Sequence, residues 1–209
     1  MSTYFDTLRT TYQDVPITEQ GISTSEFIEA TEGVVKLFDL LGSTAFAVVQ
    51  NDMNGNIKKI RDRLLATGPD LSGTLQLLVK NEGQPGDKKR TATEGLLWLL
   101  RGLDFTAQAL GHSIQNPSEE LSISFTNAYE KTLRKYHSIV VRPIFTVRIS
   151  YANQKLAMKA CPYRKDFYAK LGPSEESVRA PLQDWLAALE NIVAIMQRFF
   201  EEGQYAKGF

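Results

Sequence analysis

The sequence predicts an all-α protein with one domain. Apolar residues recur at helical intervals along most of the 209 positions, and neither an alternating strand pattern nor an internal repeat stands out. A chain of this length forms one sizeable core and buries roughly 70% of its unfolded surface. Its 23% charged and 43% hydrophobic residues are ordinary for a globular protein. We therefore expect a single helical domain that spans residues 1–209.

The first half of the chain predicts four helices. A short helix is expected within residues 3–13, and a second over residues 23–41, where a capping-box pattern begins the helix and a glycine follows it. A third helix covers residues 46–64 and ends before a Gly-Pro pair, and a shorter one covers residues 71–80. Residues 81–90 are polar and contain glycine and proline, so we expect a loop there.

The second half predicts four more helices. Residues 93–110 form the most buried helix, because their leucines cover every side of it. A long helix is expected from residue 119 or 120 to residue 144, with a kink at Pro143. The last two helices cover residues 163–171 and residues 182–200, the latter started by a proline.

A polar row on the helix over residues 46–64 is the main candidate for a site. Asp52, Asn56 and Lys59 fall within about 60° of one another around the helix. The row borders the apolar stripe of this helix instead of lying opposite it, so an amphiphile is a suitable ligand. The alternative is an ordinary amphipathic helix with a polar row worth a few tenths of a kcal/mol per contact. The apolar stripe consists of Phe46, Val49, Met53, Ile57, Ile60 and Leu64.

Trp98 and His137 each have a structural and a functional interpretation. Trp98 lies in an apolar helix, where tryptophan is normally a core residue, but an indole ring at a pocket mouth also suits the C–H edges of a sugar. His137 projects toward apolar surroundings, where a satisfied core histidine is the more common case. The chain has no Gly-rich phosphate loop, Cys/His metal spacing or nucleophile elbow. We therefore expect no enzymatic activity, metal or cofactor.

Charge and cysteine content indicate the compartment. Lys plus Arg and Asp plus Glu each number 24, and a net charge of zero argues against nucleic-acid binding and polybasic anchoring. The single cysteine, Cys161, excludes an intramolecular disulfide and fits a reducing environment. Neither a signal peptide nor a membrane-spanning run is evident. The expectation is a soluble cytosolic protein.

Several segments, in order and at compatible spacing, resemble the glycolipid transfer protein family. The resemblance covers about residues 23–171 and is greatest to fungal members of the heterokaryon-incompatibility type. Each motif is moderately specific, and the ordered set is the stronger signal. The segments are DMNGNIKKI at residues 52–60, LWLLRGL at 97–103, KYH at 135–137, IF at 144–145 and PYRKDF at 162–167.

The resemblance implies a fold, a function and roles for the site residues. It implies a two-layer sandwich of about eight helices around an apolar lipid-chain tunnel. The implied activity is non-enzymatic transfer or sensing of glycosphingolipids such as glucosylceramide, by a monomer that contacts membranes transiently. Asp52, Asn56 and Lys59 would bind the first sugar and the adjoining amide region. Trp98 would lie under that sugar, and His137 would hold the ceramide amide carbonyl. The tunnel would be lined by Phe46, Val49, Leu133 and Phe145.

The chain departs from the family pattern at two places. Ile139 stands where animal members have a membrane-docking tryptophan. Residues 147–155 form an apparent insertion, either a tolerated surface loop or a fault in the gene model.

Two other functions stay open at this point: a helical protein-interaction module, and a glycolipid hydrolase that uses Asp52. The hydrolase lacks a recognisable pair of carboxylates, and a nearby Lys59 should keep Asp52 ionised.

Overall fold

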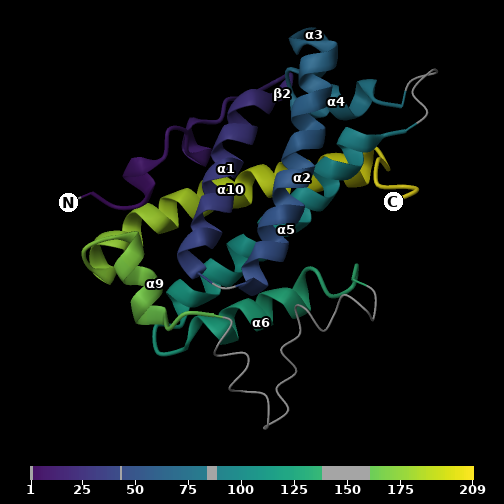
Figure 1. Cartoon of the computed structure of the whole chain (residues 1–209). Helices are drawn as coiled ribbons and strands as arrows, with labels where there is room; N and C mark the ends of the chain where they lie inside the picture. Colours follow the sequence, from purple (N-terminus) through teal and green to yellow (C-terminus); the bar gives the residue numbers. More distant parts are fainter. Residues whose placement is uncertain (1, 43, 84–88, 138–160) are drawn as a thin grey trace.

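The computed structural model confirms an all-α fold with one domain (Figure 1). The structure describes residues 2–42, 44–83, 89–137 and 161–209. Within these residues, no helix is long and apolar enough to cross a membrane. The α-helices of the described residues are α1 (Thr24–Leu41), α2 (Thr44–Thr67), α3 (Pro69–Ser72), α4 (Leu75–Asn81), α5 (Thr91–Gln115), α6 (Leu121–Lys131), α9 (Arg164–Leu171) and α10 (Glu175–Glu202).

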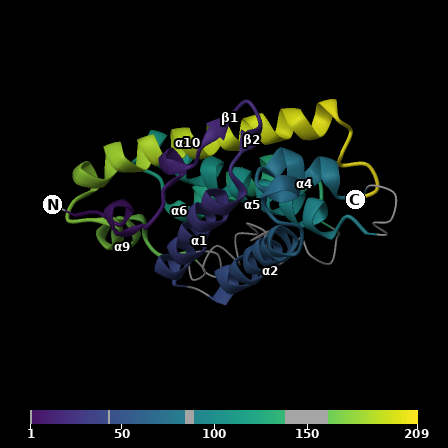
Figure 2. The same cartoon turned by 90° about the horizontal axis from the view of Figure 1, so that it is seen from above.

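Helix α5 is the centre of the fold. It packs against α2, α6 and α10, and α1 packs against α2. In the view of Figure 2, α10 lies on one side of α5, and α1 and α2 lie on the other. The leucines of α5 that were expected to cover every side are buried, whereas Trp98 among them is only half-buried. The buried leucines are Leu96, Leu97, Leu99, Leu100 and Leu103.

The N-terminal segment differs from the predicted helix over residues 3–13. It contains two 3₁₀ turns, η1 (Phe5–Thr7) and η2 (Tyr12–Asp14), followed by a small antiparallel hairpin. The rings of Phe5 and Tyr12 lie 5.6 and 5.4 Å from that of Trp185 in α10. Burial of these side chains against α10, a tertiary effect, therefore outweighs the local helical preference. The hairpin strands are β1 (Ile17–Thr18) and β2 (Gly21–Ile22).

Both predicted ends of α1 are close to the observed ones, but the predicted capping contact is different. Gly42 follows the helix with a φ of 65°, a left-handed conformation that glycine adopts without strain. At the other end, the Ser23 hydroxyl donates to the carboxylate of Glu26 and makes no side-chain cap to the helix backbone. The Ser23 backbone amide donates to the Pro16 oxygen and not to Glu26, so neither hydrogen bond of the expected capping box is formed.

Helix α6 is shorter than the predicted helix, which was expected to continue to residue 144. It ends at Lys131, and the Thr132 hydroxyl donates to the backbone oxygen of Ala128 over 2.8 Å. The Arg134 amide donates to the Tyr129 oxygen, five residues earlier, over 3.1 Å, a bond that is typical of a helix end and replaces the regular ladder. Residues 132–137 then form turns, so His137 comes from a turn instead of a helix face. Pro143 lies outside the described residues.

Two other boundaries also differ from the prediction. The helix expected over residues 71–80 is divided into α3 and α4, because Thr74 begins a new helix by accepting a hydrogen bond from the Leu77 amide. Helix α10 begins seven positions before Leu182, after the cap residue Ser174, so Pro181 lies inside the helix and does not start it. A proline in the first two turns removes only one helical hydrogen bond.

Candidate functional site

The polar row of α2 forms a chain of hydrogen bonds. The Asn56 side-chain amide donates to Asp52 Oδ2 over 3.2 Å, and Lys59 Nζ donates to Asn56 Oδ1 over 3.2 Å. Asn56 is buried, with 3% of its surface exposed, whereas Lys59 is half-buried and Asp52 is exposed. The three residues thus lie together along one edge of α2, where periodicity predicted them.

A glycine in α5 allows this edge of α2 to approach closely. A Cβ atom added at Gly95 would lie 3.0 Å from Lys59 Cδ and 3.4 Å from the backbone oxygen of Asn56. A larger residue at position 95 would therefore displace the Lys59 side chain. Gly95 precedes Trp98 by nearly one helical turn, so the contact places the α2 row beside the Trp98 segment of α5.

The side chains of Trp98 and His137 lie against each other. Their ring planes are nearly parallel, at 17°, with the centroids 6.2 Å apart. The Tyr129 hydroxyl of α6 lies 3.3 Å from His137 Nδ1 and fixes the imidazole from the other side. The turn after α6 therefore places His137 against α5, although these residues are far apart in the sequence.

The electrostatics of Asp52 link α2 to this aromatic pair. Asp52 is exposed as a residue, but desolvation of its carboxyl group by neighbouring protein raises its pKa above the ordinary value. The charges of Lys59 and His137 act in the opposite direction and lower the pKa of Asp52. Lys59 therefore favours the ionised form as expected, but desolvation has the larger effect on this pKa. All five predicted headgroup residues are thus gathered in one region.

Three of the four predicted tunnel residues are buried in the core. Phe46, Val49 and Leu133 have exposed fractions of 9%, 7% and 6%, and Phe145 lies outside the described residues. The Phe46 ring lies 5.3 Å from that of Phe125 in α6, which in turn lies 5.6 Å from the ring of Phe105. The apolar stripes of α5 and α6 contained the signal for these last two phenylalanines, which the site prediction did not include.

Arg101 and Tyr136 are two further residues of this region that the site prediction omitted. The Arg101 guanidinium carbon lies 4.5 Å from the centroid of the Trp98 ring and 3.7 Å from that of Tyr136. Desolvation lowers the pKa of Arg101, and Tyr136 acts against this lowering. An arginine among the leucines of residues 96–103 was the available sequence signal, because a cation there needs a partner.

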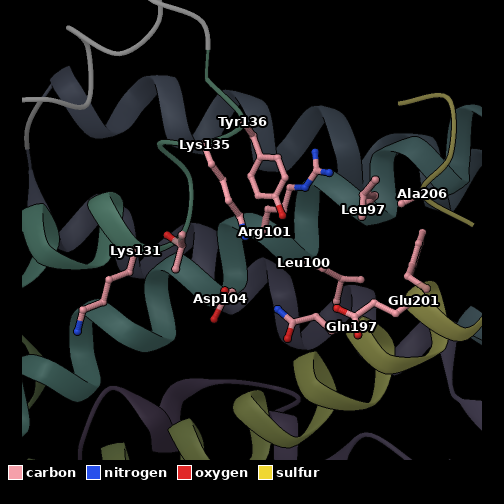
Figure 3. A pocket seen from close by; sticks show the side chains of 12 residues that line it. Leu97, Leu100, Arg101, Asp104, Lys131, Lys135, Tyr136, Gln197, Glu201 and Ala206 are labelled. Carbon is pink, nitrogen blue, oxygen red and sulfur yellow. The ribbon is translucent and has the colours of Figure 1, made fainter. Parts of the chain in front are cut away.

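A cavity of about 370 Å³ lies next to the region, between α5, the end of α6 and α10 (Figure 3). None of the five predicted headgroup residues lines it, but Arg101 and Tyr136 do. It is also lined by Leu97, Leu100, Asp104, Lys131, Thr132, Lys135, Gln197, Phe200, Glu201 and Ala206.

The arrangement provides hydrogen-bonding groups and rings for a neutral polar group beside an apolar core. Asp52 accepts hydrogen bonds, Lys59 donates them and Asn56 does both, while Trp98 offers an indole surface. Among the described residues, no group of three or more His, Cys, Asp and Glu side chains is placed to hold a metal ion. The groups of this region can form hydrogen bonds and stacking contacts with a polar ligand.

Comparison with known proteins identifies the family that the sequence motifs resemble. The family model described as Glycolipid transfer protein (GLTP) matches residues 22–173. A glycolipid transfer protein of Aureobasidium melanogenum is 54% identical over 197 residues, which cover 94% of this chain and 92% of the relative. The human pleckstrin homology domain-containing family A member 8 is 34% identical over an alignment of 211 positions, which covers 95% of this chain but only 38% of that protein.

Solved structures agree with these sequence matches. The crystal structure of HET-C2, a fungal glycolipid transfer protein, superposes with a TM-score of 0.86 at 48% identity, covering 98% of this chain and 100% of the other. The GLTP fold of FAPP2, described as selecting simple glycosphingolipids, gives a TM-score of 0.82 at 32% identity and covers 99% and 98% of the two chains. The chain belongs to the glycolipid transfer protein family.

Proposed function

We propose that this protein transfers glycosphingolipids, such as glucosylceramide, between membranes without chemical conversion. The observation that carries the proposal is the convergence of the α2 polar row, Trp98 and His137 at the edge of the apolar core. Membership of the glycolipid transfer protein family supports it, because the proteins of this family carry lipids and are not enzymes.

In this proposal, each polar group binds a different part of the lipid headgroup. The Asp52 carboxylate accepts the ceramide amide N–H, and His137 holds the amide carbonyl. Asn56 and Lys59 bind hydroxyls of the first sugar, which lies on Trp98. A site built from such groups disfavours lipids that leave them unpaired, so the polar groups set the specificity.

The apolar residues supply the affinity for the lipid chains. Each buried CH₂ contributes roughly 0.8 kcal/mol, so moving a two-chain lipid into water costs on the order of 20 kcal/mol. Hydrogen bonds at the headgroup cannot offset a cost of this size. We propose that the chains lie among Phe46, Val49, Leu133 and Phe145, of which the first three belong to the buried core.

The setting of this activity is also part of the proposal. We propose a monomer that works in the cytosol and contacts membranes transiently. Ile139 takes the position of the docking tryptophan of animal members, so other apolar side chains would share the membrane contact. The whole chain would act as one domain, with residues 147–155 as a surface insertion outside the described part.

Deletion of residues 147–155 should then preserve transfer and raise the melting temperature, because a loop is shortened.

A vesicle assay tests the proposed function. Donor vesicles contain fluorescent glucosylceramide, acceptor vesicles contain none, and the protein should accelerate its movement between them. Analysis of the same mixture for free sugar tests hydrolysis, and mass spectrometry of co-purified lipid tests the interaction-module alternative. Transfer no faster than in the protein-free control would overturn the proposal.

A further inference from the structure

We propose that Gly95 of α5 is a positioning residue for headgroup recognition, because the space beside it fixes where the Lys59 side chain of α2 lies. The proposal rests on the function proposed above, in which Lys59 binds a hydroxyl of the first sugar. Helices α2 and α5 pack against each other (Figure 1). Gly95 is buried at this contact, beside Lys59 and the backbone of Asn56.

A glycine inside a helix needs a physical reason. Apart from proline, glycine is the least favourable residue there, because its backbone loses the most conformational freedom. At Gly95 the reason is space, since an added Cβ atom would lie 3.0 Å from Lys59 Cδ and 3.1 Å from Lys59 Cβ. Gly102 lies seven positions further, on the same side of α5. There the nearest atom to an added Cβ would be Met53 Cγ at 4.0 Å, which is an ordinary contact.

Alanine at position 95 cannot be accommodated without moving Lys59. The Cδ atom belongs to the flexible stem and can turn away, but the Cβ atom is bonded to the backbone of α2. The backbone oxygen of Asn56 would also lie 3.4 Å from the added atom. Alanine therefore turns the lysine stem away from α5 or pushes α2 outward. Either movement displaces Lys59 Nζ, which lies 3.2 Å from Asn56 Oδ1.

The position of Lys59 matters for recognition in two ways. Its stem lies against Gly95 and is half-buried, so fewer rotamers are open to it than to an exposed lysine. An ammonium group that is held in place before the ligand arrives loses less entropy on binding. The same charge lowers the pKa of Asp52, the proposed acceptor of the ceramide amide. Gly95 therefore affects two headgroup contacts through one side chain.

Two matched substitutions in α5 test the proposal. Gly95→Ala and Gly102→Ala make the same chemical change on the same side of the helix, and both raise the helical preference. Transfer of fluorescent glucosylceramide between vesicles should fall by about three- to tenfold in Gly95→Ala, as expected for one weakened hydrogen bond. Transfer by Gly102→Ala should stay close to the wild-type rate. Equal rates in the two variants, or loss of the Gly95→Ala fold by circular dichroism, would overturn the proposal.

A double-mutant cycle shows whether the effect passes through Lys59. Lys59→Ala removes both the Cδ atom and the ammonium group, so adding Gly95→Ala in this background should lower transfer by less than about twofold. A further loss as large as in the wild-type background would show that Gly95 acts on packing alone. Wild-type transfer by Lys59→Ala would remove Lys59 from the site and overturn the proposal.

An NMR titration of the Asp52 side-chain carboxyl carbon gives a readout that does not depend on transfer. The pKa of Asp52 should rise in Gly95→Ala, because the charge that lowers it is moved away, and should not change in Gly102→Ala. An unchanged or lower pKa in Gly95→Ala would overturn the positioning role and leave the proposed function intact. Wild-type transfer no faster than the protein-free control would overturn both.

Discussion

Two polar clusters in this molecule differ in the partners that the protein supplies to a positively charged side chain. The first lies where α9 meets α5 and α10. Arg164 is 6% exposed, its Nη1 donates to the backbone oxygen of Ser113 over 2.6 Å, and its Nη2 pairs with the Glu175 carboxylate. Its guanidinium carbon also lies 4.3 Å from the centroid of the Tyr168 ring. This cation joins three helices and is held through both of its Nη atoms, while its buried Nε has no hydrogen-bond partner among the described residues.

The polar row of α2 is built in the opposite manner. Lys59 is half-buried, and its hydrogen bond to Asn56 measures 3.2 Å, as does that from Asn56 to Asp52. Both distances lie at the upper end of the usual range for N–H···O hydrogen bonds. In the proposed function the α2 row binds the headgroup, so we expect it to contribute less to folding than the Arg164 cluster does. Each prediction below tests this difference, from the largest expected effect to the smallest.

Replacement of Arg164 should cost the most stability. Arg164→Met removes the donor to Ser113 and the partner of Glu175, so we expect the free energy of unfolding to fall by about 2–4 kcal/mol. Urea denaturation measures the change. Lys59→Met is the control and should lower stability by less than about 1 kcal/mol. Equal losses in the two variants would remove the distinction between the clusters.

Replacement of Asp52 or Trp98 should strongly reduce glycolipid transfer and leave the fold intact. Asp52→Ala leaves the ceramide amide unpaired, at a cost of about 1–3 kcal/mol, which corresponds to at least a fivefold loss of glucosylceramide transfer. Trp98→Ala should affect sugar-bearing lipids most. Because Trp98 is half-buried, the variant also loses packing contacts, so circular dichroism of both variants accompanies the vesicle assay as a check of the fold. Transfer within twofold of the wild type in both variants would contradict the site assignment.

Replacement of Asn56 by lysine should shift headgroup preference. Asn56→Lys adds a cation beside Lys59 and removes the amide acceptor, so neutral glycolipid should bind more weakly and a phosphate headgroup more strongly. A complete switch is not expected, because Trp98 still occupies space suited to a sugar. Transfer of glucosylceramide and ceramide phosphate is measured side by side. The same preference ratio as in the wild type would refute this prediction.

The smallest expected effect is on a single pKa. The charge of Lys59 lowers the pKa of Asp52, whereas desolvation raises this pKa more strongly. Without the Lys59 charge, the effect of desolvation is less opposed. The pKa of Asp52 should therefore rise further in Lys59→Met. An NMR titration of the side-chain carboxyl carbon measures it, with Lys58→Met as a control, since Lys58 pairs with Asp62 on the exposed side of α2. A pKa that stays the same or falls would show that Lys59 does not act on Asp52.

The sequence by itself determined most helices and the polar row of α2. Helical periodicity relates residues three or four positions apart, so the closeness of Asp52, Asn56 and Lys59 follows from a single helix. The stop of α1 at Gly42 is equally local, because it depends on the backbone conformation of one residue.

Only the tertiary structure decided how this row meets the other elements. Trp98 and His137 come from separate segments, and their stacking depends on the end of α6 at Lys131 and the turn that follows. The Arg101–Tyr136 pair and the cavity beside it likewise arise between elements. Contacts of this kind depend on how closely two helices pack, as α2 and α5 do at Gly95, and periodicity along one helix carries no information about that distance.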